Sequence, residues 1–292
     1  MILEKESEIR VLRVFYDEPF DYFSVAEISQ KAKISRNWIY KVIDKFEKSG
    51  ILMKSGKKYK LNFSNVFCKR LKLLFDSDYL NSMNEDVKMD VFNMANKMLF
   101  EINPQSIVLV GSVAAQKMKK GSDIDFLVIG GNREKVPMFV NVNIILLSCR
   151  EFKERYAKGD DFVISALVFG KIIHDDTTFI KFFESPLPIF SEELIQEKIR
   201  YCEKLEDRVY ALLKTDVDEA RNELLYLALQ AARIILLRNR IVPKTKHDIA
   251  PQVSEFDREL AKILRKLLRE EKVKTEEVLD YTKICMQTAR SV

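Results

Sequence analysis

The 292-residue chain is long enough for two or three domains, and its 47% hydrophobic and 32% charged residues exclude both a disordered and a membrane-spanning protein. Its longest uncharged stretches are shorter than the ~18 to 20 residues that a membrane helix needs, so we expect no membrane partner. Four widely spaced cysteines and a start that is charged from Glu4 onward favour the reducing cytoplasm.

The net charge of +5 is unevenly distributed along the chain. Residues 1–75 contain 16 Lys and Arg against 9 Asp and Glu, whereas the remaining residues contain 33 against 35. The basic surplus therefore lies in the N-terminal quarter. It favours a nucleic-acid partner for that segment rather than for the whole chain.

Residues 1–75 show the pattern of three helices followed by a hairpin. Ser24 and Glu27 form a capping box that begins the second helix. The third helix begins after Ser35, ends at Gly50 and is followed by two short strands around a glycine turn. This order of elements predicts a winged helix-turn-helix domain.

In such a domain the third helix enters the major groove of double-stranded DNA, and the hairpin meets phosphates. The side chains in position to do so belong to one helix face and to the hairpin: Arg36, Asn37, Tyr40, Lys41, Lys45, Lys57 and Lys58. The alternative is that the domain binds another protein and that its lysines are ordinary surface residues.

A mixed pattern of helices and strands follows, and it predicts a second domain over residues 76–185. Residues 76–100 are expected to be connecting helices. The predicted strands cover residues 106–111, 124–129, 139–147 and 168–173, and the predicted helices cover residues 112–119 and 150–157.

Two short motifs flank the first pair of these strands. Gly111 and Ser112 end the first strand, where free backbone N–H groups at the start of a helix can bind an anion. Asp123 and Asp125 begin the next strand and lie on the same face, because side chains alternate along a strand. Two carboxylates on one face predict a site for Mg²⁺ or Mn²⁺ beside a phosphate.

This motif, with Gly121 and Ser122 before the acids, resembles that of the DNA polymerase β nucleotidyltransferase superfamily, and most of all its minimal members. The resemblance covers roughly residues 85–183. It implies that Gly111, Ser112, Gly121 and Ser122 bind the triphosphate of ATP or another nucleoside triphosphate, with Lys117, Lys119 or Lys120 neutralising its charge. It also implies that Asp123 and Asp125 are catalytic metal ligands.

Active members of that superfamily have a third carboxylate on a later strand, which completes the metal site and helps to remove the proton of the acceptor hydroxyl. Here the matching position is occupied by Asn143 or, in a second alignment, by Asn141. An amide offers an oxygen to a metal but has no negative charge and is no base. The base is then expected to be the substrate, water or a nearby aspartate: Asp160, Asp161 or Asp175.

Beyond a proline-containing linker, residues 190–292 show long helical periodicity that predicts a four-helix bundle. Arg240 and His247 lie between two of its helices. The segment resembles the HEPN helical domains, which implies a phosphate-binding Arg–His pair. The alternative is an arginine at a helix end and a histidine that caps the next helix. A homodimer is a further expectation.

The chain as a whole is thus predicted to be an α+β multidomain protein, in which a nucleotidyltransferase-fold mixed sheet with flanking helices lies between the winged helix and the bundle. The predicted function is metal-dependent transfer of a nucleoside monophosphate, with ATP as the expected donor, to an acceptor that the sequence does not identify. The alternative is a DNA-binding transcriptional regulator whose nucleotidyltransferase domain binds nucleotide without catalysis.

Overall fold

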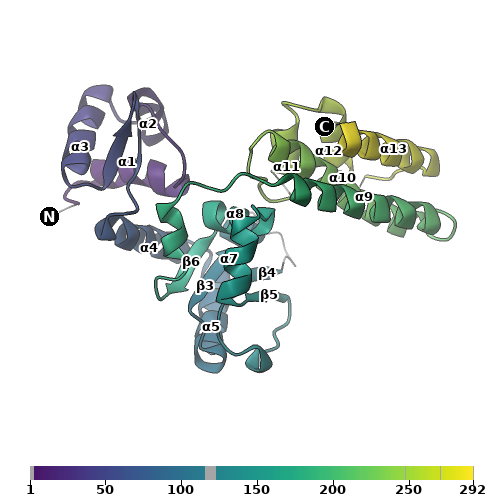
Figure 1. The fold of residues 1–292 in the computed structure, drawn as a ribbon, viewed down its shortest axis with the longest axis horizontal. Coiled ribbons are helices and arrows are strands. Elements are labelled where there is room, and N and C mark those ends of the chain that lie inside the picture. The colour runs from purple at the N-terminus through teal and green to yellow at the C-terminus, as the bar shows by residue number, and fades with distance from the viewer. Residues whose placement is uncertain (1–2, 116–122, 247, 270, 292) are drawn as a thin grey trace. The chain divides into compact units, whose positions relative to one another are not determined.

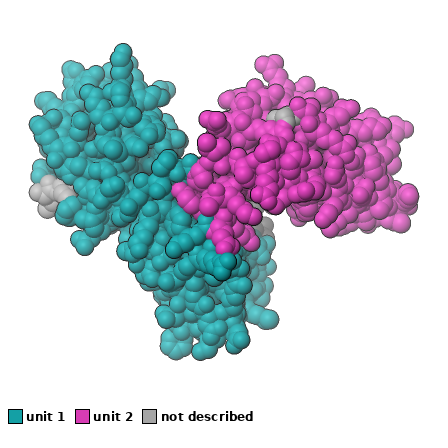
Figure 2. All heavy atoms as spheres, in the orientation of Figure 1, with its two compact units in different colours: residues 1–153, 166–187 teal, residues 154–165, 188–292 magenta. Residues whose placement is uncertain are grey.

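The structure, a computed structural model, describes residues 3–115, 123–246, 248–269 and 271–291. The chain divides into two compact units (Figure 2). The first comprises residues 1–153 and 166–187, and the second comprises residues 154–165 and 188–292. The first unit thus contains the first predicted domain and most of the second, whose residues 154–165 belong to the second unit. No helix in the described parts of the chain is long and apolar enough to span a membrane.

Unit 1 begins with a module of three helices and a hairpin, in the predicted order. The elements are α1 (Glu6–Asp17), α2 (Val25–Ala32), α3 (Arg36–Lys48), β1 (Leu52–Ser55) and β2 (Lys58–Leu61). Ser24 accepts the backbone N–H of Glu27, and the Glu27 carboxylate accepts that of Ser24, so the predicted capping box is present. Apolar side chains at helical spacing, such as Leu12, Ile28 and Ile39, form the core of the module.

Two helices, α4 (Val66–Asn81) and α5 (Glu85–Ile102), lead into a four-stranded mixed sheet with strand order β5-β4-β3-β6. Its strands are β3 (Ser106–Val110), β4 (Ile124–Ile129), β5 (Val142–Leu147) and β6 (Lys171–Asp175). Strand β3 pairs antiparallel with β4 and β6, whereas β5 pairs parallel with β4. Figure 1 traces these elements along the chain.

The remaining elements of this region are short. They are α6 (Gly111–Ala114), α7 (Cys149–Ala157), α8 (Asp161–Phe169) and the 3₁₀ turns η1 (Arg133–Lys135) and η2 (Ile180–Glu184). The last strand was predicted three residues too early, because residues 168–169 complete α8 instead. Gly170 follows α8, and its lack of a side chain lets the backbone pass close to Val108 of β3. A Cβ at Gly170 would lie 2.7 Å from a Val108 methyl group.

Side chains on the sheet alternate between two buried faces. Ile107, Leu109 and Phe126 pack with Val91 and Met98 of α5 on one face. Val110 and Asp125 are register partners on the antiparallel β3–β4 pair, so their side chains share the opposite face. The Asp125 carboxylate therefore lies where this face reaches the end of β3.

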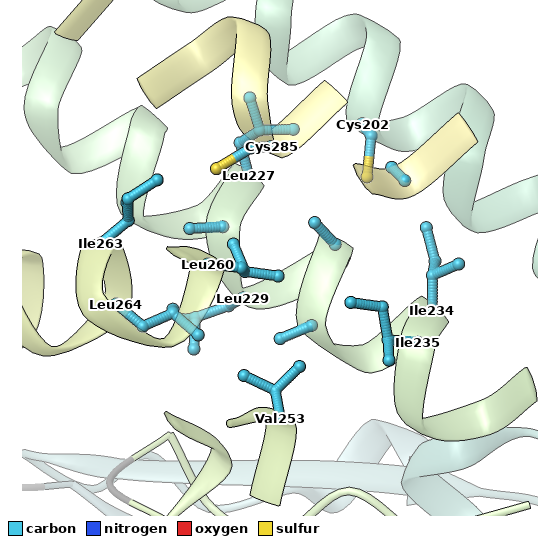
Figure 3. Close-up of a cluster of buried hydrophobic side chains, with 14 of the residues drawn as sticks. Cys202, Leu227, Leu229, Ile234, Ile235, Val253, Leu260, Ile263, Leu264 and Cys285 are labelled. Carbon is cyan, nitrogen blue, oxygen red and sulfur yellow. The ribbon is translucent and has the colours of Figure 1, made fainter. Parts of the chain in front are cut away.

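Unit 2 is a helical domain with its own core (Figure 3). Its helices are α9 (Glu192–Leu212), α10 (Val217–Arg238), α11 (Ile249–Val253), α12 (Arg258–Leu268) and α13 (Thr275–Ser291). Helix α10 is buried along its length and packs against the other four. The four longer helices lie near the ranges that the helical periodicity predicts, about 191–214, 218–240, 255–271 and 275–290, and the short α11 was not predicted. Asp216 and Asp257 cap α10 and α12, which is why those helices begin there.

Candidate functional site

The candidate site lies at one edge of the sheet, where β3 ends and β4 and β5 begin. The strand registers pair Val110 with Asp125, and Asp125 with Asn143. Asp123 comes two residues before Asp125, just outside β4. Pairing across three neighbouring strands therefore brings together positions that are up to 33 residues apart in sequence.

The turn after β3 needs a glycine. Gly111 has a φ of +73°, and a Cβ placed there would lie 2.3 Å from Oδ2 of Asp125. A side chain would meet both backbone strain and a direct collision with the carboxylate. The backbone at Gly111 thus approaches Asp125 closely, and half-buried Ser112 follows in the first turn of α6.

The amide of Asn143 faces both aspartates. Its Nδ2 donates to Oδ1 of Asp125 at 2.9 Å and, more weakly, to Oδ2 of Asp123 at 3.4 Å. Asn141 has a different position: its φ is +57°, and its carbonyl accepts the backbone N–H of Ile124 at 2.9 Å. Of the two alignments for the third acid, the structure thus places Asn143, and not Asn141, beside the aspartates.

These donors fit a hard divalent cation only in part. Within the described residues, no group of three or more His, Cys, Asp and Glu side chains is arranged to hold a metal. Asp123 and Asp125 supply two carboxylates, and turning the Asn143 amide about its χ2 bond would offer a third oxygen. These oxygen ligands are of the kind that Mg²⁺ or Mn²⁺ binds, but the set carries one negative charge fewer than three carboxylates would.

Asp175 lies too far from this edge to replace the missing acid. It pairs with Ser106 at the opposite end of β3, about 13 Å along the strand from Val110. Its carboxylate accepts the Ser106 hydroxyl at 2.6 Å and the backbone N–H groups of Phe179 and Ile180. Asp175 is therefore a structural residue.

The other two aspartates that were considered as bases belong to unit 2. Asp160 accepts the backbone N–H groups of Phe162 and Val163 at the start of α8, each at 3.1 Å. Asp161 forms an ion pair of 2.8 Å with Lys198. Each has a structural partner within its own unit.

Several predicted residues fall outside the described part of the chain. They are Lys117, its alternatives Lys119 and Lys120, Gly121, Ser122 and His247. Arg240, the predicted partner of His247, is exposed just after α10, with a φ of +59° and its backbone N–H bonded to the carbonyl of Leu237. The HEPN-like pair stays a prediction.

The predicted DNA-contacting residues differ in their surroundings. Arg36, Asn37, Tyr40 and Lys41 are exposed on α3, and Lys57 and Lys58 are exposed on the hairpin. Lys45, by contrast, is half-buried and forms ion pairs with Glu8 at 2.9 Å and Glu4 at 3.7 Å. The ammonium group of Lys45 thus joins α3 to the start of α1, and a DNA contact at Lys45 stays a prediction.

An aromatic contact beside this pair was missed at the sequence level. The Trp38 indole N–H donates to the Ser7 hydroxyl at 2.9 Å. The Lys5 ammonium lies 4.7 Å from the ring centroid, and the Lys41 ammonium lies 5.9 Å from it. The helical spacing of Trp38 with Ile39, Val42 and Phe46 indicates only an apolar position on α3.

Residues 93–206 match the family model of the nucleotidyltransferase domain. The chain contains a nucleotidyltransferase domain. The match covers all four strands of the sheet, together with Gly111, Asp125 and Asn143, and it continues into α9. These are the residues that meet at the sheet edge.

Among solved structures, the chain is similar to a nucleotidyltransferase-like protein from Exiguobacterium sibiricum. The two are 14% identical with a TM-score of 0.39, over 64% of this chain and 69% of that one. No curated protein matches the chain.

Proposed function

We propose that this protein is a metal-dependent nucleotidyltransferase that transfers a nucleoside monophosphate from ATP or another nucleoside triphosphate to an acceptor hydroxyl. One observation carries the proposal: the glycine turn and two aspartates meet at one sheet edge inside the segment that matches the nucleotidyltransferase family. A phosphate-binding turn beside a two-carboxylate site is what this reaction requires.

In this proposal, the turn and the two aspartates at the sheet edge have separate roles. Ser112 and the backbone N–H groups of the turn bind the terminal phosphates, while Asp123 and Asp125 hold Mg²⁺ or Mn²⁺. When bound, the metal neutralises phosphate charge. The acceptor oxygen forms a bond to the α-phosphorus, the bond from that phosphorus to the bridging oxygen breaks, and pyrophosphate leaves.

The proton of the acceptor hydroxyl has no carboxylate to receive it at residue 143. Asn143 is a hydrogen-bond donor to both aspartates and is no base at neutral pH. The proton therefore passes to water or to a phosphate oxygen of the substrate. This predicts slow transfer compared with an enzyme that has three acids.

The basic N-terminal module supplies the second part of the proposal. Its exposed cationic side chains on α3 and on the hairpin suit the phosphates of double-stranded DNA. We propose a cytoplasmic, DNA-associated enzyme, with a homodimer as its expected state and a HEPN-like helical unit.

The test combines the purified protein, labelled nucleoside triphosphates, Mg²⁺ or Mn²⁺ and a panel of hydroxyl-bearing acceptors. Label transfer by the wild type and its loss in an Asp123→Ala/Asp125→Ala variant are expected. Asp175→Ala serves as the matched control, because that carboxylate lies at the other end of β3. Transfer that survives in the Asp123→Ala/Asp125→Ala variant, or that is absent from the wild type, would rule out the enzyme.

The second candidate is a DNA-binding regulator that binds nucleotide without turnover. Asn143 favours it, because the amide completes hydrogen bonds to both carboxylates but adds no charge for a metal. Salt-dependent duplex binding that responds to nucleotide, with no turnover, would support the regulator. Turnover that does not depend on DNA would support the enzyme.

A further inference from the structure

Helix α4 reaches the phosphate-binding turn through one side chain. The Tyr79 hydroxyl donates a hydrogen bond to the backbone carbonyl of Ala114, the last residue of α6. Carbonyl groups at the end of a helix have no intrahelical donor, so an outside donor fixes their position. Because α6 is a single turn that begins at Gly111, Tyr79 holds the far end of that turn.

The surroundings of Tyr79 keep it a donor. Burial, together with the nearby carboxylates of Asp17 and Asp76, raises the pKa of the phenol to about 12. The ammonium group of Lys171 lies 4.4 Å from the ring centroid. At neutral pH the hydroxyl is therefore protonated and available to the Ala114 carbonyl.

A buried ion pair anchors the middle of α4 to the sheet. Lys72 and Asp76 lie one turn apart, each with a side chain only 2% exposed, and the Lys72 Nζ donates to both Asp76 oxygens at 2.6 and 2.5 Å. Asp76 also accepts the backbone N–H of Ile172 on β6 at 3.0 Å. Such a pair is costly to break, since either partner alone would be an uncompensated buried charge.

The same helix packs against α1 of the N-terminal module. The Tyr16 hydroxyl donates to the Cys68 carbonyl at 2.9 Å, and the Tyr16 and Phe75 rings stack with their centroids 4.7 Å apart. Arg13 also forms an ion pair of 2.5 Å with Asp78. A movement of α1 would therefore act on α4, and through Tyr79 on the turn at Gly111.

We propose that Tyr79 is a positioning residue that couples the N-terminal module to the phosphate-binding turn through α4. Three links carry the coupling: α1 to α4 at Tyr16, α4 to the sheet at Asp76, and α4 to the turn at Tyr79. Ligands of the module and of the turn then influence one another reciprocally. This last consequence rests on the proposed function, whereas the coupling itself does not.

The test compares three Tyr→Phe variants of the full chain, each lacking one hydroxyl, by hydrogen exchange of residues 106–115. Exchange of the Ala115 amide, which bonds to the Gly111 carbonyl, reports on the turn. Loss of one hydrogen bond predicts about fivefold faster exchange in Tyr79→Phe. Tyr16→Phe is expected to give a smaller rise, and the exposed control Tyr201→Phe on α9 none.

Unchanged exchange in Tyr79→Phe would overturn the proposal. So would a rise confined to Tyr79→Phe, because α1 would then have no influence on the turn. A rise spread evenly over the sheet with a lower unfolding midpoint would mean general destabilisation and overturn it too.

A separate titration with Mg²⁺-ATP distinguishes the coupling from the proposed function. We expect affinity about fivefold weaker in Tyr79→Phe than in the wild type and Tyr201→Phe. Equal affinity in all three would count against Tyr79. A wild type that binds neither Mg²⁺-ATP nor the Mg²⁺ complex of another nucleoside triphosphate would refute the proposed function, and the exchange data would still decide the coupling.

Discussion

Asn143 donates its side-chain amide to Asp125 from the adjacent parallel strand, at 2.9 Å and in register. A carboxylate at residue 143 would instead face two others. Asn143→Asp is therefore expected to lower the stability of the metal-free protein by on the order of 1 to 2 kcal/mol through like-charge repulsion. Mn²⁺ should then raise the unfolding temperature more than it does in the wild type, and label transfer should increase.

Asn141→Asp is the matched control for this substitution. It adds the same charge two residues earlier, at a residue whose backbone carbonyl bonds to Ile124. It should show neither the Mn²⁺-dependent gain nor faster transfer. If Asn143→Asp behaves like this control, residue 143 is not part of the metal site.

Gly111→Ala should damage both stability and nucleotide binding. Its Cβ would collide with Asp125 at a backbone φ of +73°, which predicts a loss of about 2 to 4 kcal/mol from strain and overpacking together. Gly56→Ala isolates the strain, because φ is +60° there and a Cβ would have nothing within 4 Å. We expect about 1 kcal/mol for Gly56→Ala in urea unfolding. Equal losses at the two positions would contradict the close approach of Asp125.

The buried Lys72–Asp76 ion pair on α4 should show a larger coupling energy than an exposed ion pair of the same sequence spacing. Lys72→Met alone is expected to cost about 3 to 5 kcal/mol, because Asp76 stays buried without its partner. Adding Asp76→Asn should restore about 1 to 3 kcal/mol of this loss in a double-mutant cycle followed by urea unfolding.

The exposed pair on α3 serves as the reference. Asp44 and Lys48 are 2.6 Å apart with side chains 62% and 75% exposed. Their substitution should change stability by less than about 0.5 kcal/mol, since solvent screens such pairs. Similar coupling in both cycles would mean that burial does not strengthen the Lys72–Asp76 pair.

Glu8 predicts an acid-sensitive step in the stability of the N-terminal module. Burial opposes ionisation, but hydrogen bonds from the backbone at Glu4 and Lys5 and from the Lys45 ammonium outweigh it, so the pKa of Glu8 is lowered. A lowered folded-state pKa means that the stabilisation is complete above about pH 4.3, the usual value for the unfolded chain. It is lost as the pH falls from there through the folded-state value.

Unfolding midpoints between neutral and acidic pH will show this step. Glu8→Gln should lower stability at pH 7 and flatten the acid-side loss, because residue 8 no longer titrates. A variant with the same acid-side slope as the wild type would assign the step to another carboxylate.

The salt dependence of duplex DNA binding should change on substitution of the exposed Lys57 or Lys58 but not of Lys45. Each alanine at Lys57 or Lys58 is expected to reduce the slope of log affinity against log salt by about 0.9, as one phosphate contact is lost. Lys45→Ala should leave this slope unchanged and lower the unfolding midpoint, because Lys45 pairs with Glu8. Fluorescence anisotropy over a salt series measures the slope, and an equal change in all three variants would identify Lys45 as a DNA contact.

Local sequence patterns predicted the helices of the N-terminal module and the nucleotidyltransferase motif. Hydrophobic periodicity and the Ser24–Glu27 capping box located the helices of the N-terminal module, because helix period and caps depend on neighbouring residues. The spacing of Gly111, Asp123 and Asp125 predicted a nucleotidyltransferase domain, which the family match supports.

Only the tertiary structure decided which distant residues meet. Parallel pairing of β4 with β5 selected Asn143 over Asn141, because register is a long-range property. Pairing of β3 with β6 places Asp175 at the end of β3 that lies away from the candidate site. Packing of α3 against α1 brings Lys45 into an ion pair with Glu8. The link from Tyr79 to Ala114 had no local signal either, since it joins residues 35 positions apart through packing alone.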